Sequence, residues 1–392
     1  MAKQIKLALW NANGLTQHRQ ELIQFISNHE IDIMLISETH FTEKSCIKIP
    51  KFTVYTTQHP DGTAHGGTAV MIKSTIKHHA LDNYNEEHIQ ATSISIEDWI
   101  GPLTITAVYC PPKHTIKKER FEKFYNTLGH RFIAGGDYNA KHPQWGSRLA
   151  TPKGRELLKA MQTNNLRHLS TGEPTYWPTD QRKIPDCIDF CVVKGIPDNC
   201  LEATTSFDLS SDHSPIIVTV GTKALSTKKS PSLCSKKTDW NNFRELVEKN
   251  LQLQIPLKSP NDIEVAIEQL NKTLQQAGWN STPETKIGAE SNYCPANIKQ
   301  KIKEKRQLRK RWQTTRSNCD KSKLNKAVKE LKQLLQEDRN QSIQKYLESL
   351  NATQASDYSL WRATRKLNRP QLTIPPLKRE DGSWAKSDKQ KA

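Results

Sequence analysis

The sequence predicts an α/β fold over residues 1–222, followed by a smaller all-α region that is basic. Two observations predict the α/β part: the chain starts with a strand, a helix and a second strand, and further apolar strand-length segments follow with amphipathic helices between them. A third observation marks the change after residue 222, because most apolar residues there recur at helical spacing and basic side chains are in excess.

The first strand, Ile5–Trp10, leads through a glycine turn into a helix that Thr16 is expected to cap. The next apolar segment, Ile31–Ile36, predicts a second buried strand and is followed closely by Glu38. A strand–helix–strand unit makes a right-handed crossover between neighbouring strands. We therefore expect Asn11 and Glu38, which follow the two strands, at the same edge of the sheet.

The rest of this half predicts more short strands with two helices between them. The strands are expected at Thr53–Thr57, Thr68–Lys73, Ala91–Ile96, Leu103–Tyr109, Phe132–Ala134, around Asp189 and at Ile216–Val220. The helices are expected at Glu119–Leu128 and Pro152–Met161.

The segment Phe132–Ala140 has the sequence F-I-A-G-G-D-Y-N-A, a short buried strand that runs into a glycine turn. Side chains two apart in an extended segment point the same way, so Asp137 and Asn139 are expected to converge just past the strand end. Ligands of α/β proteins commonly bind at strand ends. By itself this pattern is more typical of an ordinary turn than of an active site.

Polar side chains that could take part in catalysis or binding end, or lie within, most strands of this half. They are Asn11, Glu38, Tyr109, Asp137, Asn139, Asp189, Asp212 and His213. Taken one at a time, each is explained about equally well as a turn former, a capped loop or a core residue with an exposed polar tip. Their occurrence in strand order indicates a shared site.

The net charge of +17 is unevenly distributed along the chain. Residues 1–222 hold 23 Lys and Arg against 23 Asp and Glu, so the whole excess of +17 lies in residues 223–392. Such asymmetry favours a nucleic acid or another acidic surface as a partner of the C-terminal part.

The sequence predicts four parts: a domain at 1–222, a linker rich in Ser, Lys and Pro at 223–238, a helical basic region at 239–369 and an extended segment at 370–392. Two long helices, at Pro295–Thr315 and Ser322–Leu350, are expected to form an α-hairpin. The second carries leucines and a valine at alternating four- and three-residue spacing, which is typical of a coiled-coil seam.

Eight cysteines are present without a C-x-x-C pair, so a zinc site is not expected and a reducing compartment fits best. No apolar run is long enough to span a membrane, and no membrane partner is expected. The chain starts almost directly with a strand, so a secretory signal is not expected either.

The ordered motifs W-N-A-N-G, I-S-E-T, V-Y-C-P-P, G-G-D-Y-N, I-D-F and S-D-H-S-P-I resemble those of the endonuclease/exonuclease/phosphatase superfamily. The resemblance covers about residues 3–222 and is greatest to the endonuclease domain of jockey-type non-LTR retrotransposons. The basic run K-R-Q-L-R-K-R-W-Q and the segment Ser359–Leu367 resemble the stretch that precedes the reverse transcriptase in those polyproteins. No reverse-transcriptase motif occurs here, so the resemblance implies a copy or fragment truncated before that domain.

The resemblance implies a DNase I-like, four-layer α/β sandwich with its site at one edge of two packed sheets. It implies a DNA endonuclease that depends on Mg²⁺, for which Mn²⁺ can substitute, with Glu38 and Asn11 as metal-holding residues. The implied partner is a double-stranded DNA target, nicked so that its 3′-hydroxyl primes reverse transcription. A nuclear location after cytoplasmic synthesis follows from the same resemblance.

The resemblance also assigns roles to the other polar residues. Asp137 would activate the attacking water and Asn139 would position it, while Asp212 would hold His213 in one tautomer. Asp189 would support the histidine or the metal, and Tyr109 would donate a hydrogen bond to the phosphate or the leaving group. Phosphate or DNA contacts are assigned to Asn13, Thr175 and Ser211. Asn13 replaces the Asp that abasic-site enzymes tend to have, which counts against abasic-site repair.

Two other functions remain open at this point. One is a phosphodiesterase or phosphatase of the same fold that acts on a small or lipid substrate. The other is a nucleic-acid-binding protein with an inactive nuclease half. In the basic region, Arg306, Arg309 and Lys310 share a helix face near Trp312, which predicts binding of single-stranded DNA or RNA. A solvated face that only keeps the helices soluble is the alternative.

Overall fold

The computed structural model describes residues 4–222, 224–225, 233–234, 238–251, 257–283 and 294–348, together with two short strands, Leu377–Lys378 and Trp384–Ala385. The chain divides into two compact units. One unit consists of Met1–Ser226 with Cys294–Ala392, and the other of Thr227–Tyr293.

Six strands form the first sheet, in the order β12-β13-β1-β2-β4-β3. Their bounds are β1 (Ile5–Asn11), β2 (Ile33–Ser37), β3 (Phe52–Thr57), β4 (Thr68–Lys73), β12 (Leu201–Thr205) and β13 (Ile216–Val220). β1 and β2 are parallel, and every other neighbouring pair is antiparallel. Helix α1 (Arg19–His29) makes the crossover that a parallel pair requires, as the sequence predicts.

The second sheet has the order β10-β11-β9-β8-β7-β5, and β6 pairs separately with β7. Its strands are β5 (His78–Ala80), β6 (Tyr84–Glu86), β7 (Ile89–Glu97), β8 (Pro102–Tyr109), β9 (Phe132–Asp137), β10 (Arg167–Leu169) and β11 (Asp189–Lys194). β8 and β9 are parallel and are joined by helix α2 (Lys118–Asn126). The sequence patterns did not reveal the short strands β5, β6, β10 and β12.

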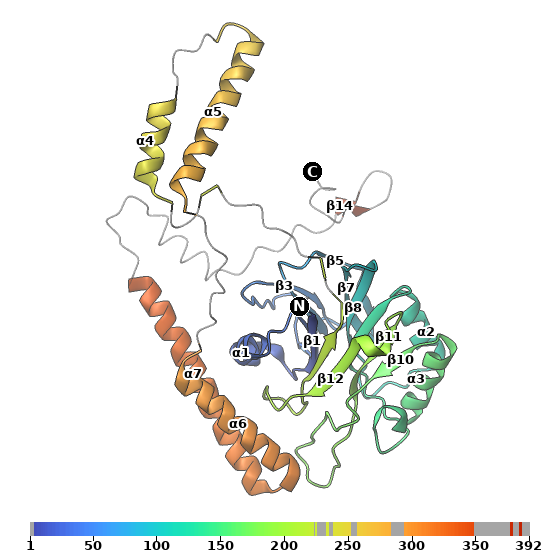
Figure 1. The fold of residues 1–392 in the computed structure, drawn as a ribbon. Coiled ribbons are helices and arrows are strands. Elements are labelled where there is room, and N and C mark those ends of the chain that lie inside the picture. Colours follow the sequence, from blue (N-terminus) through green and yellow to red (C-terminus); the bar gives the residue numbers. More distant parts are fainter. Residues whose placement is uncertain are drawn as a thin grey trace. The chain divides into compact units, whose positions relative to one another are not determined.

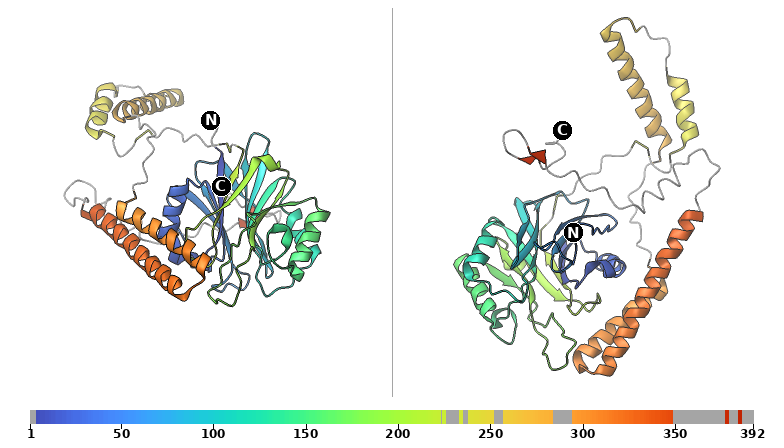
Figure 2. Two further views of the ribbon diagram at one scale, coloured as in Figure 1. Left: turned by 60° about the horizontal axis from the view of Figure 1, so that its bottom comes forward. Right: turned by 180° about the vertical axis from the view of Figure 1, so that it is seen from behind.

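The two sheets pack face to face, with α1 on the outer side of the first sheet and α2 and α3 (Pro152–Thr163) on the outer side of the second (Figures 1 and 2). Strand β1 shows why: Leu7 and Leu9 face the core between the sheets, while Ala8 and Trp10 face the core beneath α1. A strand that is apolar on both faces must be covered on both sides. The predicted four-layer sandwich is confirmed.

Helices α6 (Ala296–Thr315) and α7 (Asn318–Glu348) pack along one another through an apolar seam. Ile298 and Ile302 of α6 meet Leu331 and Leu335 of α7 in a small buried cluster. Figure 1 shows the two helices as a hairpin. They belong to the same compact unit as the sheets and not to the unit of residues 227–293, whereas the sequence analysis placed all of 239–369 in one helical region.

The second unit contains α4 (Trp240–Asn250) and α5 (Pro260–Ser281), which pack against each other. Asp239 caps α4, and Ser259 caps α5 in a reciprocal capping box with Asp262. None of the helices that the structure describes combines the length and apolarity of a membrane span. Most of the predicted linker at 223–238, the segment Ser359–Leu367 and the extended segment at 370–392, apart from its two short strands, lie outside the described residues.

Candidate active site

The polar residues predicted from strand ends meet at one edge of the two sheets. Asn11 pairs in register with Ser37 in the first sheet, and Asp137 pairs with both Tyr109 and Asp189 in the second. All of these side chains are buried, and the side chain of Asp137 is 1% exposed. Because the sheets pack face to face, the ends of strands from both sheets supply a single site.

Asn11 links the two sheets. Its Nδ2 donates to Glu38 Oε1 at 3.0 Å and to Asp137 Oδ2 at 2.9 Å, while its Oδ1 accepts from the Asn13 backbone N–H at 3.0 Å. The amide oxygen that the sequence analysis assigned to a metal thus accepts one bond and keeps a second lone pair. In this structure Asn11 acts as a donor that holds two carboxylates together, and its role as a metal ligand stays a prediction.

Asp137 is held by a second asparagine from its own loop. The Asn139 backbone N–H donates to Asp137 Oδ1 at 2.8 Å, and Asn139 Nδ2 donates to Oδ2 at 3.0 Å. Asn139 and Glu38 both take positive φ angles, 46° and 52°. Non-glycine residues in this region are uncommon and concentrate at functional sites. The turn after each strand therefore aims its polar side chain back toward the strand end.

Gly136 is required for the approach of β9 to its neighbour. A Cβ atom at this position would collide with the Val108 carbonyl oxygen and lie 2.9 Å from Ser37 Oγ. Any other residue would push β9 away from β8 and displace the carboxylate of Asp137, which is the next residue.

His213 is oriented by Asp189, not by Asp212. His213 Nδ1 lies 2.7 Å from Asp189 Oδ2, whereas Asp212 Oδ1 accepts a long 3.5 Å bond from Asn13 Nδ2. The prediction that Asp212 holds His213 is wrong. Asp189 contacts the histidine instead, which is one of the two roles that the sequence analysis gave it. His213 is buried against Asp189 of β11, whereas Asp212 is half-buried and lies beside Asn13.

Thr175 and Ser211 are both engaged within the protein. The Thr175 hydroxyl donates to Asp189 Oδ2 at 2.7 Å and accepts from the backbone N–H groups of Ile188 and Asp189, both at 3.1 Å. Ser211 Oγ donates to the Asn11 carbonyl at 2.7 Å. In place of the predicted phosphate contacts, these hydroxyls fix Asp189 and the chain around His213.

Burial and crowded charge control the protonation of the site. Burial and the neighbouring Asp189 carboxylate raise the pKa of Asp137 to about 8, against the opposing effect of His213. Burial lowers the pKa of His213, but Asp189 and Asp137 outweigh it and raise that pKa to about 10. Burial and the carboxylates of Glu38 and Asp137 raise the pKa of Tyr109 well above its usual value, so its hydroxyl remains a proton donor.

The oxygen-rich part of the site fits a divalent cation. Glu38 and Asp137 present carboxylate oxygens to the common donor Asn11. Magnesium favours oxygen ligands and commonly binds through one or two carboxylates. Burial and the neighbouring carboxylates raise the pKa of Asp137, and a bound cation would favour its ionised form. The nearby cluster of Asp137, Asp189 and His213 is a second candidate, but Asp189 already bonds to His213.

Helix α6 contacts the loop that carries His213. The Arg309 guanidinium is buried and donates to the backbone carbonyls of Asp208, Leu209, Ser211 and His213. Lys305 pairs with Glu21, and Arg306 pairs with Asp208. The predicted nucleic-acid face is thus wrong for Arg309, which is buried. Arg306 pairs with Asp208 but its side chain is 39% exposed, and Lys310 is exposed, so for these two the face stays a prediction.

Trp312 is also buried and is not free to stack on a base. Its ring lies 4.8 Å from the Arg316 guanidinium and 3.9 Å from the Lys321 ammonium. One sequence signal could have indicated this burial. Ile298, Ile302, Lys305, Arg309 and Trp312 follow one another at four- and three-residue spacing, so the two cations share a face with apolar residues.

Acid should weaken the packing of α6 against α1, and we expect the free energy of unfolding to fall below about pH 4. Burial acts to raise the pKa of Glu21, but Lys305, His18 and Ser210 outweigh it and lower the pKa from 4.5 to about 2. A depressed pKa contributes stability that is complete above the unfolded value and is lost toward the folded value. Urea unfolding at pH 6 and pH 3 should differ by about 2 kcal/mol more in the parent than in Glu21→Gln, because at pH 3 the unfolded glutamate is almost fully protonated while the folded one is still ionised. An equal pH dependence in the two proteins would contradict this assignment.

The chain is similar in sequence to known proteins over nearly all of its length. Residues 103–217 match a family model described as endonuclease-reverse transcriptase. The chain is 32% identical over 392 residues to the probable RNA-directed DNA polymerase from transposon BS of Drosophila melanogaster, a match that covers 99% of this chain and 43% of that protein. The chain belongs to the jockey-type retrotransposon endonucleases of the endonuclease/exonuclease/phosphatase superfamily.

A second relative matches this retrotransposon endonuclease over the same part of its length. The RNA-directed DNA polymerase from mobile element jockey of Drosophila funebris is 29% identical over 390 residues, which is 99% of this chain and 43% of that protein. The chain thus spans less than half the length of these relatives. Among solved structures, the endonuclease domain of TRAS1, a telomere-specific non-LTR retrotransposon, is 20% identical with a TM-score of 0.47, and the match covers 55% of this chain and 98% of that domain.

Proposed function

We propose that this protein is a divalent-metal-dependent endonuclease that nicks one strand of double-stranded target DNA for retrotransposon insertion. The freed 3′-hydroxyl would then prime reverse transcription. The observation that carries the proposal is the bridge made by Asn11 between Glu38 and Asp137, because it joins two carboxylates from different sheets at one buried point. A nuclear site of action follows from the DNA target.

In the proposed reaction each group of the chain has a defined task. Glu38 and Asp137 would hold the cation, which would neutralise charge on the scissile phosphate. Asp137, whose orientation Asn11 and Asn139 fix, would accept the proton of the attacking water in its ionised form, which a bound cation would favour against the raised pKa. His213, held by Asp189, donates from Nε2 to a phosphate oxygen. Tyr109 donates its hydroxyl proton to a hydrogen bond with the phosphate.

The relatives support DNA as the substrate, because the proteins over which the match extends are named as polymerases of mobile elements. Insertion of such an element requires a break in target DNA. A small-molecule or lipid phosphatase of the same fold would not need a basic helical hairpin beside its site.

Plasmid nicking tests this function directly. We expect the full chain to convert supercoiled plasmid to the open circle with Mg²⁺ or Mn²⁺ and to leave it intact with EDTA. The conversion is followed on an agarose gel over time. Failure to nick under any divalent metal, by protein whose circular dichroism shows it to be folded, would exclude the proposal. Release of phosphate from small phosphomonoesters without nicking would favour a phosphatase.

A further inference from the structure

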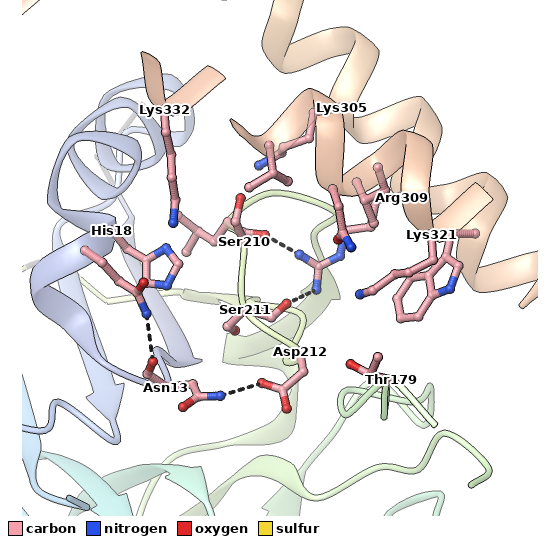
Figure 3. Close-up of a pocket in the computed structure, with 16 residues that line it drawn as sticks. Asn13, His18, Thr179, Ser210, Ser211, Asp212, Lys305, Arg309, Lys321 and Lys332 are labelled. Atoms are coloured by element: carbon pink, nitrogen blue, oxygen red, sulfur yellow. Dashed lines mark hydrogen bonds between the residues drawn. The ribbon is translucent and has the colours of Figure 1, made fainter. Parts of the chain in front are cut away.

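A pocket of about 290 Å³ lies where the α6–α7 hairpin meets the loop that precedes β13. Figure 3 shows Lys321 and Lys332 directed into it, opposite Asn13 and Asp212. Its lining is mostly polar and cationic. The residues are Asn13, Gln17, His18, Thr179, Leu209, Ser210, Ser211, Asp212, Lys305, Arg309, Trp312, Lys321, Leu324, Asn325, Val328 and Lys332.

The pocket carries an excess of positive charge. Asp212 is the single carboxylate among the lining residues, against four Lys and Arg side chains. Lys305 is neutralised by Glu21, but within the described part of the chain no carboxylate forms an ion pair with Arg309, Lys321 or Lys332. The two terminal nitrogens of Arg309 donate to backbone carbonyls, and these bonds do not cancel its charge. A bound anion would therefore be stabilised by these cations.

Lys321 is held in a position to meet such an anion. Its ammonium lies 3.9 Å from the centre of the Trp312 ring, and it is half-buried there. Burial and the neighbouring Arg309 lower the pKa of Lys321, which shows that its positive charge is poorly solvated. A phosphate oxygen can accept from a lysine ammonium as from a point charge.

The pocket shares a wall with the candidate active site. Asn13 and Asp212 line the pocket and bond to each other, and the Asn13 backbone N–H donates to Asn11 Oδ1. Ser211, another lining residue, donates to the Asn11 carbonyl. Asn11 in turn bridges the two carboxylates of the site. A strand bound with its scissile phosphate at those carboxylates would have a neighbouring phosphate within reach of the pocket.

We propose that this pocket binds a backbone phosphate of the substrate DNA strand next to the scissile one, which makes the α6–α7 hairpin part of the nuclease's substrate-binding surface. The proposal rests on the endonuclease function argued above. The volume of the pocket suits one phosphate with its sugar and is too small for a duplex, so the contact is to one strand. Contacts to phosphate fix the register of a strand without reading its sequence.

The test compares two double variants of the full chain. Lys321→Gln with Lys332→Gln removes two charges from the pocket, and Lys323→Gln with Lys326→Gln removes two exposed charges from the same helix. In α7, positions 321, 324, 325, 328 and 332 share one face, and positions 323 and 326 lie away from it. Binding of a fluorescent duplex oligonucleotide is measured by anisotropy in EDTA across a range of salt concentrations.

We expect the pocket variant to bind duplex DNA about tenfold more weakly, and the slope of log K against log salt to become shallower by about 1–2. The control variant should keep the parental slope and the parental nicking rate. Equal losses in the two variants would overturn the proposal, because they would show only a general charge effect. A loss confined to a single-stranded RNA probe would overturn it in favour of RNA.

The binding result is independent of whether the protein nicks DNA. If the parent binds duplex through the pocket but never nicks plasmid, the endonuclease function fails and the phosphate site stands. If the parent nicks plasmid and the pocket variant binds and nicks as well as the control, the function stands and the pocket proposal fails.

Discussion

Replacing Asp137 with Asn is expected to slow plasmid nicking by about 10²–10⁴-fold, the usual range for loss of an acid–base group. The substitution removes the proton acceptor and one carboxylate of the cation site while it preserves side-chain shape. Stability should change little, because the buried carboxylate of Asp137 is itself unfavourable, as its raised pKa shows. Nicking time courses and thermal unfolding of the same preparation measure both effects.

The neighbouring aspartates provide the matched comparison. Asp189→Asn should approach the loss seen for Asp137→Asn, because His213 would lose the carboxylate that fixes its tautomer. Asp212→Asn should cost far less, since Asp212 makes only a long bond to Asn13. If Asp212→Asn proved as damaging as Asp189→Asn, the assignment of the histidine's partner would be wrong. Parental nicking by Asp137→Asn would remove Asp137 from the mechanism.

Replacing Arg309 with Met is expected to lower the free energy of unfolding by about 3–5 kcal/mol and to reduce nicking strongly. The guanidinium is buried and donates to carbonyls on both sides of Asp212, in the loop that leads to His213. Methionine fills similar space but leaves these carbonyls without donors. Urea unfolding gives the stability change, and nicking at saturating DNA gives the functional one.

Two further variants separate positioning from simple folding. Lys310→Met changes the adjacent, exposed residue of α6 and should alter neither stability nor nicking. Arg309→Lys keeps a charge and some of the donors, so it should recover part of the nicking rate at a temperature where all variants are folded. A fully active, folded Arg309→Met protein would show that α6 does not position the catalytic loop.

Much of the fold was predictable from the sequence, because its core strands have local patterns of apolar residues that can be recognised without the rest of the chain. Ile5–Trp10 and Ile31–Ile36 are apolar on both faces, which requires cover on both sides and so predicts a layered α/β arrangement. The short strands β5 and β10 escaped prediction. Each has three residues without a buried face, so it leaves no periodic signal and forms only by pairing with a longer strand.

The members of the site were predictable as well, but their partners were not. Asp137 ends β9, Asp189 begins β11 and His213 lies just before β13, so local sequence indicated them. Which carboxylate contacts the histidine depends on the side of the chain from which His213 points and on the sheet that lies there. In the structure Asp189 lies 2.7 Å from His213 Nδ1, while Asp212, although adjacent in sequence, bonds to Asn13.

For residues 1–222, the sequence by itself determined which strands carry functional residues and in which order they occur. Strand patterns and the residues that end strands are local properties. Only the tertiary structure decided the role of α6. A run rich in Lys and Arg is usually solvated, yet Lys305 and Arg309 are buried because Glu21 and the carbonyls before His213 offer them partners. Those partners lie more than 90 residues away in the chain, and a contact of that kind exists only once the hairpin has docked.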